Sequence, residues 1–406
     1  MDYLNVHEKP TYDNSLKSYL YQVISPNNST ALGHNDEIRF SCQNTDAYTA
    51  PCDSKLHIIG KIVNAANEKT VVDPAVQFIQ NCAAFLFSEI KYELNSVVID
   101  STRNVGVTSS LLYYSALNDS EAKAAQKASW GTPTINPSTG DFDFTIDLKY
   151  FLGFFADYKH AIVNARQELV LLRSKNDDNV FVTTDDTKLG KIIIKKIDWQ
   201  LPFLMPNDEY RLNLLNTVKN NQPIHLTFRS FETMEFPNIP ANTNKLNWQL
   251  KLSKNLERPR IIIFALTTGN IDKVKGTASS FSHCDVENVK LYLNSTVVPY
   301  YPYDVKWSSN QFSRLYSDFT EFRKIYYGID TSDTHVDMTT FKTKCPLWIF
   351  NANHIGDMIN VDGSVDVRLE IQSKNNIPAN TNAYAVIISD RLIEYNPFTR
   401  LINRIM

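Results

Sequence analysis

Apolar and polar residues alternate with a period of two in several stretches of the chain. Three segments show this alternation: 141–149, 246–252 and 365–371. The pattern predicts strands with one buried and one solvated face. Three other runs are continuously apolar: 191–197, 261–266 and 385–388. These runs predict strands that are buried more deeply.

Apolar residues at helical spacing are rare and confined to short segments. They predict a helix near Ser109 in SSLLYYSAL, and another at 208–218 with Asn207 or Asp208 as its cap. A third begins near Asn310. Strands do not alternate regularly with long helices, which disfavours a parallel βαβ architecture. Many strands with turn-rich connections favour antiparallel sandwiches.

The chain contains a short internal repeat. IKYELNSVV at Ile90–Val98 aligns with VKLYLNSTVV at Val289–Val298, about half the chain length further on. Each copy is followed by a candidate helix that carries tyrosine. The matched order of strand, loop and helix indicates a duplication. We therefore expect Asn95 and Asn294 at equivalent strand ends, with the chain dividing near residue 189.

Charge and cysteine content narrow the classes of function. The chain has 41 basic and 44 acidic residues and no basic stripe, so wrapping nucleic acid is not its main source of affinity. The five cysteines include no CxxC pair and predict buried free thiols: Cys42, Cys52, Cys82, Cys284 and Cys345. We expect no signal peptide, no membrane span and a reducing cytosolic or nuclear environment.

Catalytic signatures are absent from the sequence. None of the motifs GxSxG, GxxxxGK[ST], GxGxxG or HExxH occurs. The histidines are scattered: His7, His34, His57, His160, His225, His283, His335 and His354. Cys284 lies between His283 and Asp285, but neighbours in a strand point to opposite faces, so a buried thiol is favoured. The sequence predicts no catalytic, cofactor-binding or metal-binding residue.

Polar motifs have plain structural interpretations. The pairs Asp177/Asp178 and Asp185/Asp186 are typical of solvated turns, and no spaced calcium-binding motif accompanies them. Four asparagines open N-x-[ST] sequons: Asn27, Asn28, Asn118 and Asn294. Without a signal peptide we expect no glycosylation, and a turn role for Asn294. The aromatic cluster Tyr300–Trp307 favours a loop that packs on a sheet or a neighbouring subunit over base stacking.

The last residues break the strand pattern. Alternation stops after Ser389, and Pro397 cannot donate to a ladder. Thr399 is placed to cap a helical turn that would gather three apolar residues beside two arginines: Leu401, Ile402, Ile405, Arg400 and Arg404. We expect the tail to be an assembly element outside the second sandwich. The alternative is a tail that folds back on its own subunit or is frayed.

Five segments carry a resemblance to a known family. Asn81–Asp100 resembles the first-domain signature of double jelly-roll capsid proteins. Asp147–Ser174, Pro259–Asn270, Phe281–Trp307 and Asn310–Phe322 are similar to the major capsid proteins of polinton-type and adintovirus-like elements, particularly insect-associated copies. This lineage includes proteins resembling the adenovirus hexon. The blocks occur in the family's order, and that order gives the resemblance its weight.

The resemblance implies an all-β chain of two tandem eight-stranded antiparallel jelly rolls with short helices in the loops. We expect an N-terminal arm at 1–30, a first jelly roll at 31–189, a second at 190–390 and a C-terminal tail at 391–406. The implied role is a structural, non-enzymatic homotrimer that forms pseudo-hexagonal capsomers of an icosahedral virion, assembled in the host cytoplasm or nucleus.

The implied partners are neighbouring capsomers and penton and minor capsid proteins, with only indirect contact to packaged DNA. A minor capsid protein or a domesticated, element-derived copy is one alternative. A tandem jelly-roll protein that binds or cleaves glycans is another. That class would show acids and Trp concentrated between the domains, and the sequence shows no such concentration.

Overall fold

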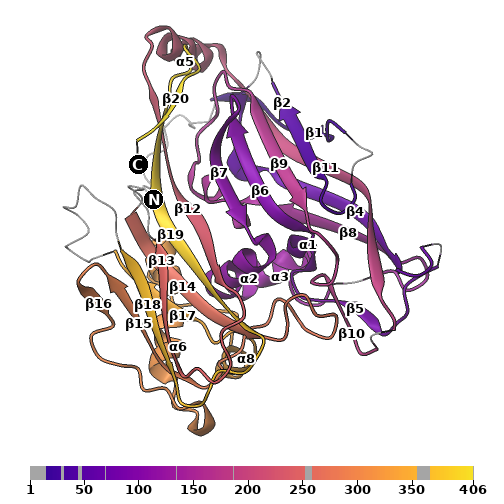
Figure 1. Cartoon of the computed structure of the whole chain (residues 1–406). Coiled ribbons are helices and arrows are strands. Elements are labelled where there is room, and N and C mark those ends of the chain that lie inside the picture. Colours follow the sequence, from indigo (N-terminus) through magenta and orange to yellow (C-terminus); the bar gives the residue numbers. More distant parts are fainter. Residues whose placement is uncertain are drawn as a thin grey trace, which may run out of the picture.

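The computed structural model describes residues 15–28, 32–43, 48–68, 70–133, 135–185, 187–251, 258–353 and 366–405. These residues form two β-sandwiches that lie side by side, with short helices between them and at their ends (Figure 1).

The first sandwich consists of two antiparallel sheets, in the orders β1-β11-β4-β8 and β2-β9-β6-β7, with β3 added to β11. Its strands are β1 (Leu16–Ile24), β2 (Glu37–Cys42), β3 (Tyr48–Thr49), β4 (Lys55–Asn64), β6 (Phe87–Leu94), β7 (Val97–Arg103), β8 (Asp141–Asp147), β9 (Gln167–Arg173) and β11 (Gly190–Pro206). A small ribbon joins β5 (Val76–Phe78) to β10 (Phe181–Thr183).

The second sandwich consists of sheets in the orders β12-β19-β14-β17 and β13-β18-β15-β16, with β20 added to β19. Its strands are β12 (Ile224–Phe236), β13 (Lys245–Lys251), β14 (Arg258–Thr268), β15 (Val286–Leu293), β16 (Thr296–Val298), β17 (Trp348–Asn351), β18 (Val367–Ser373), β19 (Thr381–Tyr395) and β20 (Ile402–Arg404).

Both sandwiches follow one topology. Apart from the short β3, β5, β10 and β20, each contributes eight strands, and numbering them in chain order gives sheets 1-8-3-6 and 2-7-4-5 in each case. This is the strand order of a jelly roll. The predicted fold class, two tandem antiparallel jelly rolls, is confirmed.

The repeated asparagines occupy matching positions. Asn95 follows β6 and Asn294 follows β15, both with positive φ, so each begins the turn into the next strand. The Asn95 side chain accepts the backbone N–H of Arg166 at 2.9 Å, and the Asn294 side chain accepts that of Asp366 at 2.9 Å. Each asparagine therefore ties its turn to the start of the seventh strand, as the duplication predicted.

The alternating segments form the expected strands. In β8, Phe142, Phe144 and Ile146 are buried, while the polar residues between them are partly or fully exposed. The segments at 246–252 and 365–371 become β13 and β18, although Leu252 and Val365 lie outside the described residues. The apolar runs lie in β11, β14 and β19.

The helices are short and lie in the connections. They are η1 (Pro51–Asp53), α1 (Cys82–Phe85), α2 (Val105–Ala116), α3 (Asp119–Ala124), η2 (Ala125–Ala128), η3 (Leu148–Tyr150), α4 (Gly153–Asp157), α5 (Asp208–Lys219), η4 (Trp307–Ser309), α6 (Ser313–Thr320), α7 (Phe322–Tyr327) and α8 (Met338–Lys344). The three predicted helices correspond to α2, α5 and α6.

Strand pairing corrects the expected domain limits. β11 begins at Gly190, where the second jelly roll was predicted to start, yet it pairs with β1 and β4 of the first. The eighth strand of a jelly roll must return to the first, so the division falls after Pro206. β1 lies inside the predicted N-terminal arm but is the first strand of its sheet.

The prediction that the C-terminal tail lies outside the second sandwich is wrong. The Asn396 side chain accepts the N–H groups of Phe398 and Thr399, each at 3.0 Å, and forms a turn where a helical turn was expected. The chain then reverses, and β20 pairs with the end of β19. The final residues thus extend the second sandwich.

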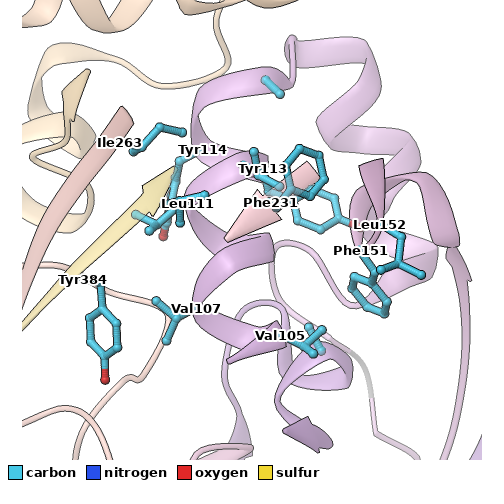
Figure 2. Packing of buried hydrophobic residues seen from close by; sticks show 14 of the residues in the cluster. Val105, Val107, Leu111, Tyr113, Tyr114, Phe151, Leu152, Phe231, Ile263 and Tyr384 are labelled. Atoms are coloured by element: carbon cyan, nitrogen blue, oxygen red, sulfur yellow. The ribbon is translucent and has the colours of Figure 1, made fainter. Parts of the chain in front are cut away.

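One continuous hydrophobic core runs through both sandwiches. All twelve residues of α2 are buried, because this helix lies between the sandwiches and has no solvated face. Figure 2 shows its side chains Val107, Leu111 and Tyr114 directed toward residues of the second sandwich such as Ile263 and Tyr384. The two jelly rolls therefore share their packing.

Candidate functional site

The junction between the sandwiches is held by a chelated ion pair. The Arg229 backbone N–H donates to Asp157 Oδ2 at 2.9 Å, and its Nε donates to the same oxygen at 2.7 Å. A further guanidinium nitrogen bonds the other carboxylate oxygen. The guanidinium also lies 3.8 Å from the ring centroid of Tyr326. Since Asp157 ends α4 and Arg229 lies in β12, this pair fixes one sandwich against the other.

A second ionic contact at the junction involves the fully buried carboxylate of Asp100 and the partly buried Arg391. Asp100 accepts N–H groups of Ser101 and Phe154 at 2.9 and 3.0 Å. Arg391 approaches it to 3.7 Å and donates to the Ile99 carbonyl at 2.9 Å. Burial raises the pKa of Asp100 to about 6, although the Arg391 charge and the N–H groups act in the opposite direction.

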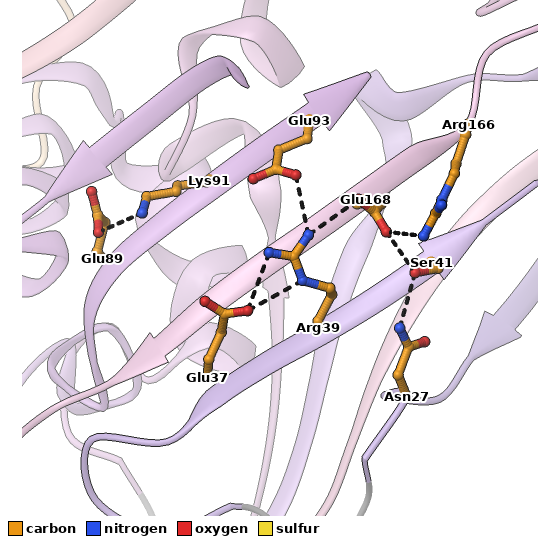
Figure 3. Close-up of polar contacts among 9 residues, drawn as sticks. All are labelled: Asn27, Glu37, Arg39, Ser41, Glu89, Lys91, Glu93, Arg166 and Glu168. Atoms are coloured by element: carbon orange, nitrogen blue, oxygen red, sulfur yellow. Dashed lines mark hydrogen bonds and ion pairs between the residues drawn. The ribbon is translucent and has the colours of Figure 1, made fainter. Parts of the chain in front are cut away.

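The outer face of one sheet carries a charged network (Figure 3). Arg39 on β2 joins three carboxylates, each at 3.1 Å: Glu37, Glu93 and Glu168. Burial raises the pKa of Glu168, but the Ser41 hydrogen bond, Arg166 and Arg39 outweigh it and hold the pKa below its ordinary value. These bonds cross β2, β9 and β6, so they reinforce the strand register on a polar face.

Other surfaces are apolar and uncovered within the described chain. The edge strand β1 exposes five large side chains, the β1 surface: Leu16, Tyr19, Leu20, Tyr21 and Val23. Helix α5 and the tail lie at one end of the molecule (Figure 1) and form the α5–tail surface: Tyr210, Leu212, Leu215, Phe398, Leu401 and Ile405. Exposed apolar groups in such numbers are typical of protein interfaces.

The tail is also tied to the first sandwich. Asn164 donates to the Pro397 carbonyl at 2.7 Å, and Asn95 donates to the Arg400 carbonyl at 3.2 Å. Arg400 in turn donates to the Asn164 side chain at 3.2 Å. The tail therefore folds back on its own subunit, the alternative noted from the sequence, and it still presents apolar residues outward.

The residues around Cys284 do not lie in a strand, contrary to the sequence interpretation. Cys284 and Asp285 form a turn with positive φ just before β15. The His283 ring stacks on Trp307 at 4.8 Å and accepts the Asp285 N–H at 3.0 Å. Burial raises the pKa of the Cys284 thiol, which disfavours a nucleophilic thiolate.

The remaining histidines and cysteines are dispersed. Among the described residues, no three His, Cys, Asp or Glu side chains form a group suited to a metal ion. His7 and His354 lie outside that part of the chain. All five cysteines are described and free, four of them buried. No helix in the described ranges is both long and apolar enough to span a membrane.

The paired aspartates differ from one another. Asp177 was expected in a solvated turn, but it is buried, pairs with Arg173 and accepts the Ile192 N–H at 2.8 Å. It serves as the counterion of a buried arginine, which sequence spacing alone did not reveal. Asp185 is a turn residue as predicted, accepting the Thr187 N–H at 3.0 Å. Asp186 lies outside the described residues.

The aromatic cluster at 300–307 divides into two parts. Trp307 donates its indole N–H to the Val286 carbonyl at 2.8 Å, and Tyr303 packs against Trp348 with ring centroids 5.2 Å apart. Tyr300 and Tyr301 are 82% and 70% exposed and do not share that sheet contact. The first part packs on a sheet as expected, and the second is accessible to a partner.

The chain contains two jelly rolls of equal topology that share one hydrophobic core, and it exposes several apolar segments. These features define a double jelly-roll protein. Consistent with this class, the family model described as "Double jelly roll-like domain" matches residues 76–393. The chain belongs to that family. No match is found among curated proteins.

The solved structures that this chain resembles include viral major capsid proteins. PBCV-1 VP54, fitted into a reconstruction of the virophage Sputnik, has a TM-score of 0.63 at 8% identity, covering 98% of this chain and 99% of that chain. The Faustovirus major capsid protein has a TM-score of 0.60 at 10% identity, covering 98% of this chain and 92% of that chain. The mavirus major capsid protein has a TM-score of 0.56 at 12% identity, covering 98% of this chain and 92% of that chain. At these identities the likeness establishes the fold.

Proposed function

We propose that this chain is a major capsid protein that forms a homotrimeric, pseudo-hexagonal capsomer. The observation that carries the proposal is the presence, in one chain, of two jelly rolls of identical strand order that share one hydrophobic core. Three such chains present six similar sandwiches around a threefold axis, a unit that tiles a hexagonal lattice. The solved structures of the same fold that are titled major capsid proteins support this role.

The exposed apolar segments support assembly. β1 lies at the edge of its sheet in the described chain, and Leu20 and Val23 on it are 62% and 58% exposed. An exposed edge of this kind is a site for association unless it is covered. We propose that the β1 surface and Tyr300/Tyr301 contribute to contacts between subunits and capsomers, and that the α5–tail surface meets neighbouring subunits, penton or minor capsid proteins.

The remaining features fit a structural, non-enzymatic role in the virion. The formal net charge is −3 and the network around Arg39 is rich in carboxylates, and both support our proposal that contact with a packaged genome is indirect. The sequence resemblance favours a polinton-type or adintovirus-like element as the source. Assembly takes place in the host cytoplasm or nucleus.

The test is expression of the chain alone, followed by light scattering and electron microscopy. We expect stable trimers at micromolar concentration and, at higher concentration, hexagonal arrays or closed particles. Leu20→Glu should weaken assembly while the monomer stays folded, because it charges an exposed edge. Met338→Glu, at an exposed site on α8, is the matched control and should assemble normally. A folded, stable monomer in the parent chain would refute the proposal.

A further inference from the structure

A cavity of about 510 Å³ opens at the junction of the sandwiches, beside the Asp157–Arg229 pair. Its apolar and aromatic wall comes from both halves of the chain: Leu112, Tyr150, Phe231, Tyr326, Tyr327 and Ile329. Cavities of roughly 300–1,000 Å³ with such walls are typical of small-molecule sites. The dimensions therefore suit a compact ligand with an apolar body.

Positively charged side chains outnumber negatively charged ones around the cavity. Four cationic side chains and two carboxylates line it. Both carboxylates are already neutralised, Asp157 by Arg229 and Glu121 by Arg323. Lys149 and Lys159 are exposed, and neither forms an ion pair with any residue the structure describes. The cavity lining therefore carries an excess of positive charge on two exposed lysines next to an apolar interior, and Lys149 Nζ lies 5.0 Å from the centroid of the Tyr150 ring in the wall.

We propose that this cavity binds a small amphipathic organic anion, such as a medium-chain fatty carboxylate. The apolar body packs against the tyrosine and leucine wall, and the head group meets Lys149 and Lys159 at the mouth. Such a ligand would contact α2 and η3 of the first sandwich and α7 and β12 of the second at once. Its binding would thus stabilise the junction and raise the melting temperature.

The experiment is calorimetric titration of the purified full chain with decanoate, with decyltrimethylammonium as a probe of matched length and opposite charge. We expect one saturable decanoate site per chain and no competing site for the cation. Lys149→Glu with Lys159→Glu should weaken decanoate binding at least about tenfold. The double variant Lys219→Glu with Lys245→Glu makes the same charge change at exposed lysines away from this cavity, and should bind like the parent.

A second variant addresses the apolar wall. Ala156→Phe places a ring in the cavity and should abolish binding, while circular dichroism shows that the chain remains folded. The proposal is overturned if both probes bind equally or if reversing Lys149 and Lys159 has no effect. It is also overturned if binding disappears when trimers form, because a neighbouring subunit would then fill the cavity. The measurement uses the soluble chain, so its outcome does not depend on whether capsids form.

Discussion

Removing the Arg229 side chain should show how much its contacts across the junction of the two sandwiches contribute to the free energy of unfolding. Arg229→Ala deletes two charge-assisted hydrogen bonds to Asp157, one to the Tyr326 carbonyl and the stacking on the Tyr326 ring. Buried charge-assisted bonds contribute about 1.5–3 kcal/mol each, and the cation–π contact about 1 kcal/mol. The Arg229 and Asp157 side chains are 23% and 18% exposed, so solvent screening reduces the sum. We expect a loss of about 3 kcal/mol in the free energy of unfolding.

A double-mutant cycle with Asp157→Asn isolates the ionic part. The coupling energy should be about 1.5 kcal/mol, measured by urea unfolding at one fixed protein concentration. Arg229→Lys should recover less than half of the loss, because an ammonium cannot chelate a carboxylate with two parallel bonds. The control is the pair Lys195 and Asp141, whose side chains are 49% and 42% exposed and whose coupling should stay below about 0.5 kcal/mol. Equal coupling energies in both cycles would show that the Arg229–Asp157 pair stabilises the fold no more than an exposed ion pair does.

Four further outcomes are expected. Gly153→Ala should cost at least about 3 kcal/mol, because the new Cβ would lie 1.6 Å from the Arg229 carbonyl oxygen, whereas Gly328→Ala, in open space at φ +67°, should cost about 1 kcal/mol in the same unfolding assay. The folded-state pKa of Asp100, about 6, exceeds the ordinary 3.8, so its contribution to stability is complete below about pH 4 and is lost as the pH rises through about 6. Asp100→Asn should therefore gain stability relative to the parent between about pH 4 and pH 7, and a difference that is flat with pH would contradict this. A reducing agent should leave the melting temperature unchanged, since the cysteines are free; a fall of several degrees would reveal a bridge. Deleting Pro397–Met406 should leave trimers that fail to close into particles, whereas particles at normal yield would exclude an assembly role for the tail.

Local sequence patterns predict much of the fold. The alternation in β8 and the LNS repeat succeeded because each depends on residues close together in sequence, which directly fix the side-chain period and the turn. The same kind of pattern also placed α2 and α5. In contrast, the assignment of residues 190–206 to the second jelly roll was wrong. This segment forms β11, which pairs with β1 and β4, and the order in which strands return to a sheet is a long-range property.

The junction and its cavity could not be predicted from the sequence for a related reason. Asp157 and Arg229 lie in unrelated local patterns, and only the packing of α4 on β12 brings them together. Asp177 resembled a turn residue because its buried partner Arg173 lies at the end of a strand, where arginine is usually solvated. The tail prediction failed because the Asn396 side chain, not the helical spacing of Leu401 and Ile405, determines the local turn.

The common core has a consequence for how the chain is synthesised. β1 cannot pair until β11 has left the ribosome, since Ile24 lies opposite Trp199. Even then α2 lacks the second sandwich that buries its remaining side, and that sandwich closes only when β19 reaches β12. A nascent chain therefore exposes an apolar helix during most of translation, which makes it slow to fold and prone to aggregate. Production of this protein should accordingly depend on slow synthesis or on chaperones that shield that helix.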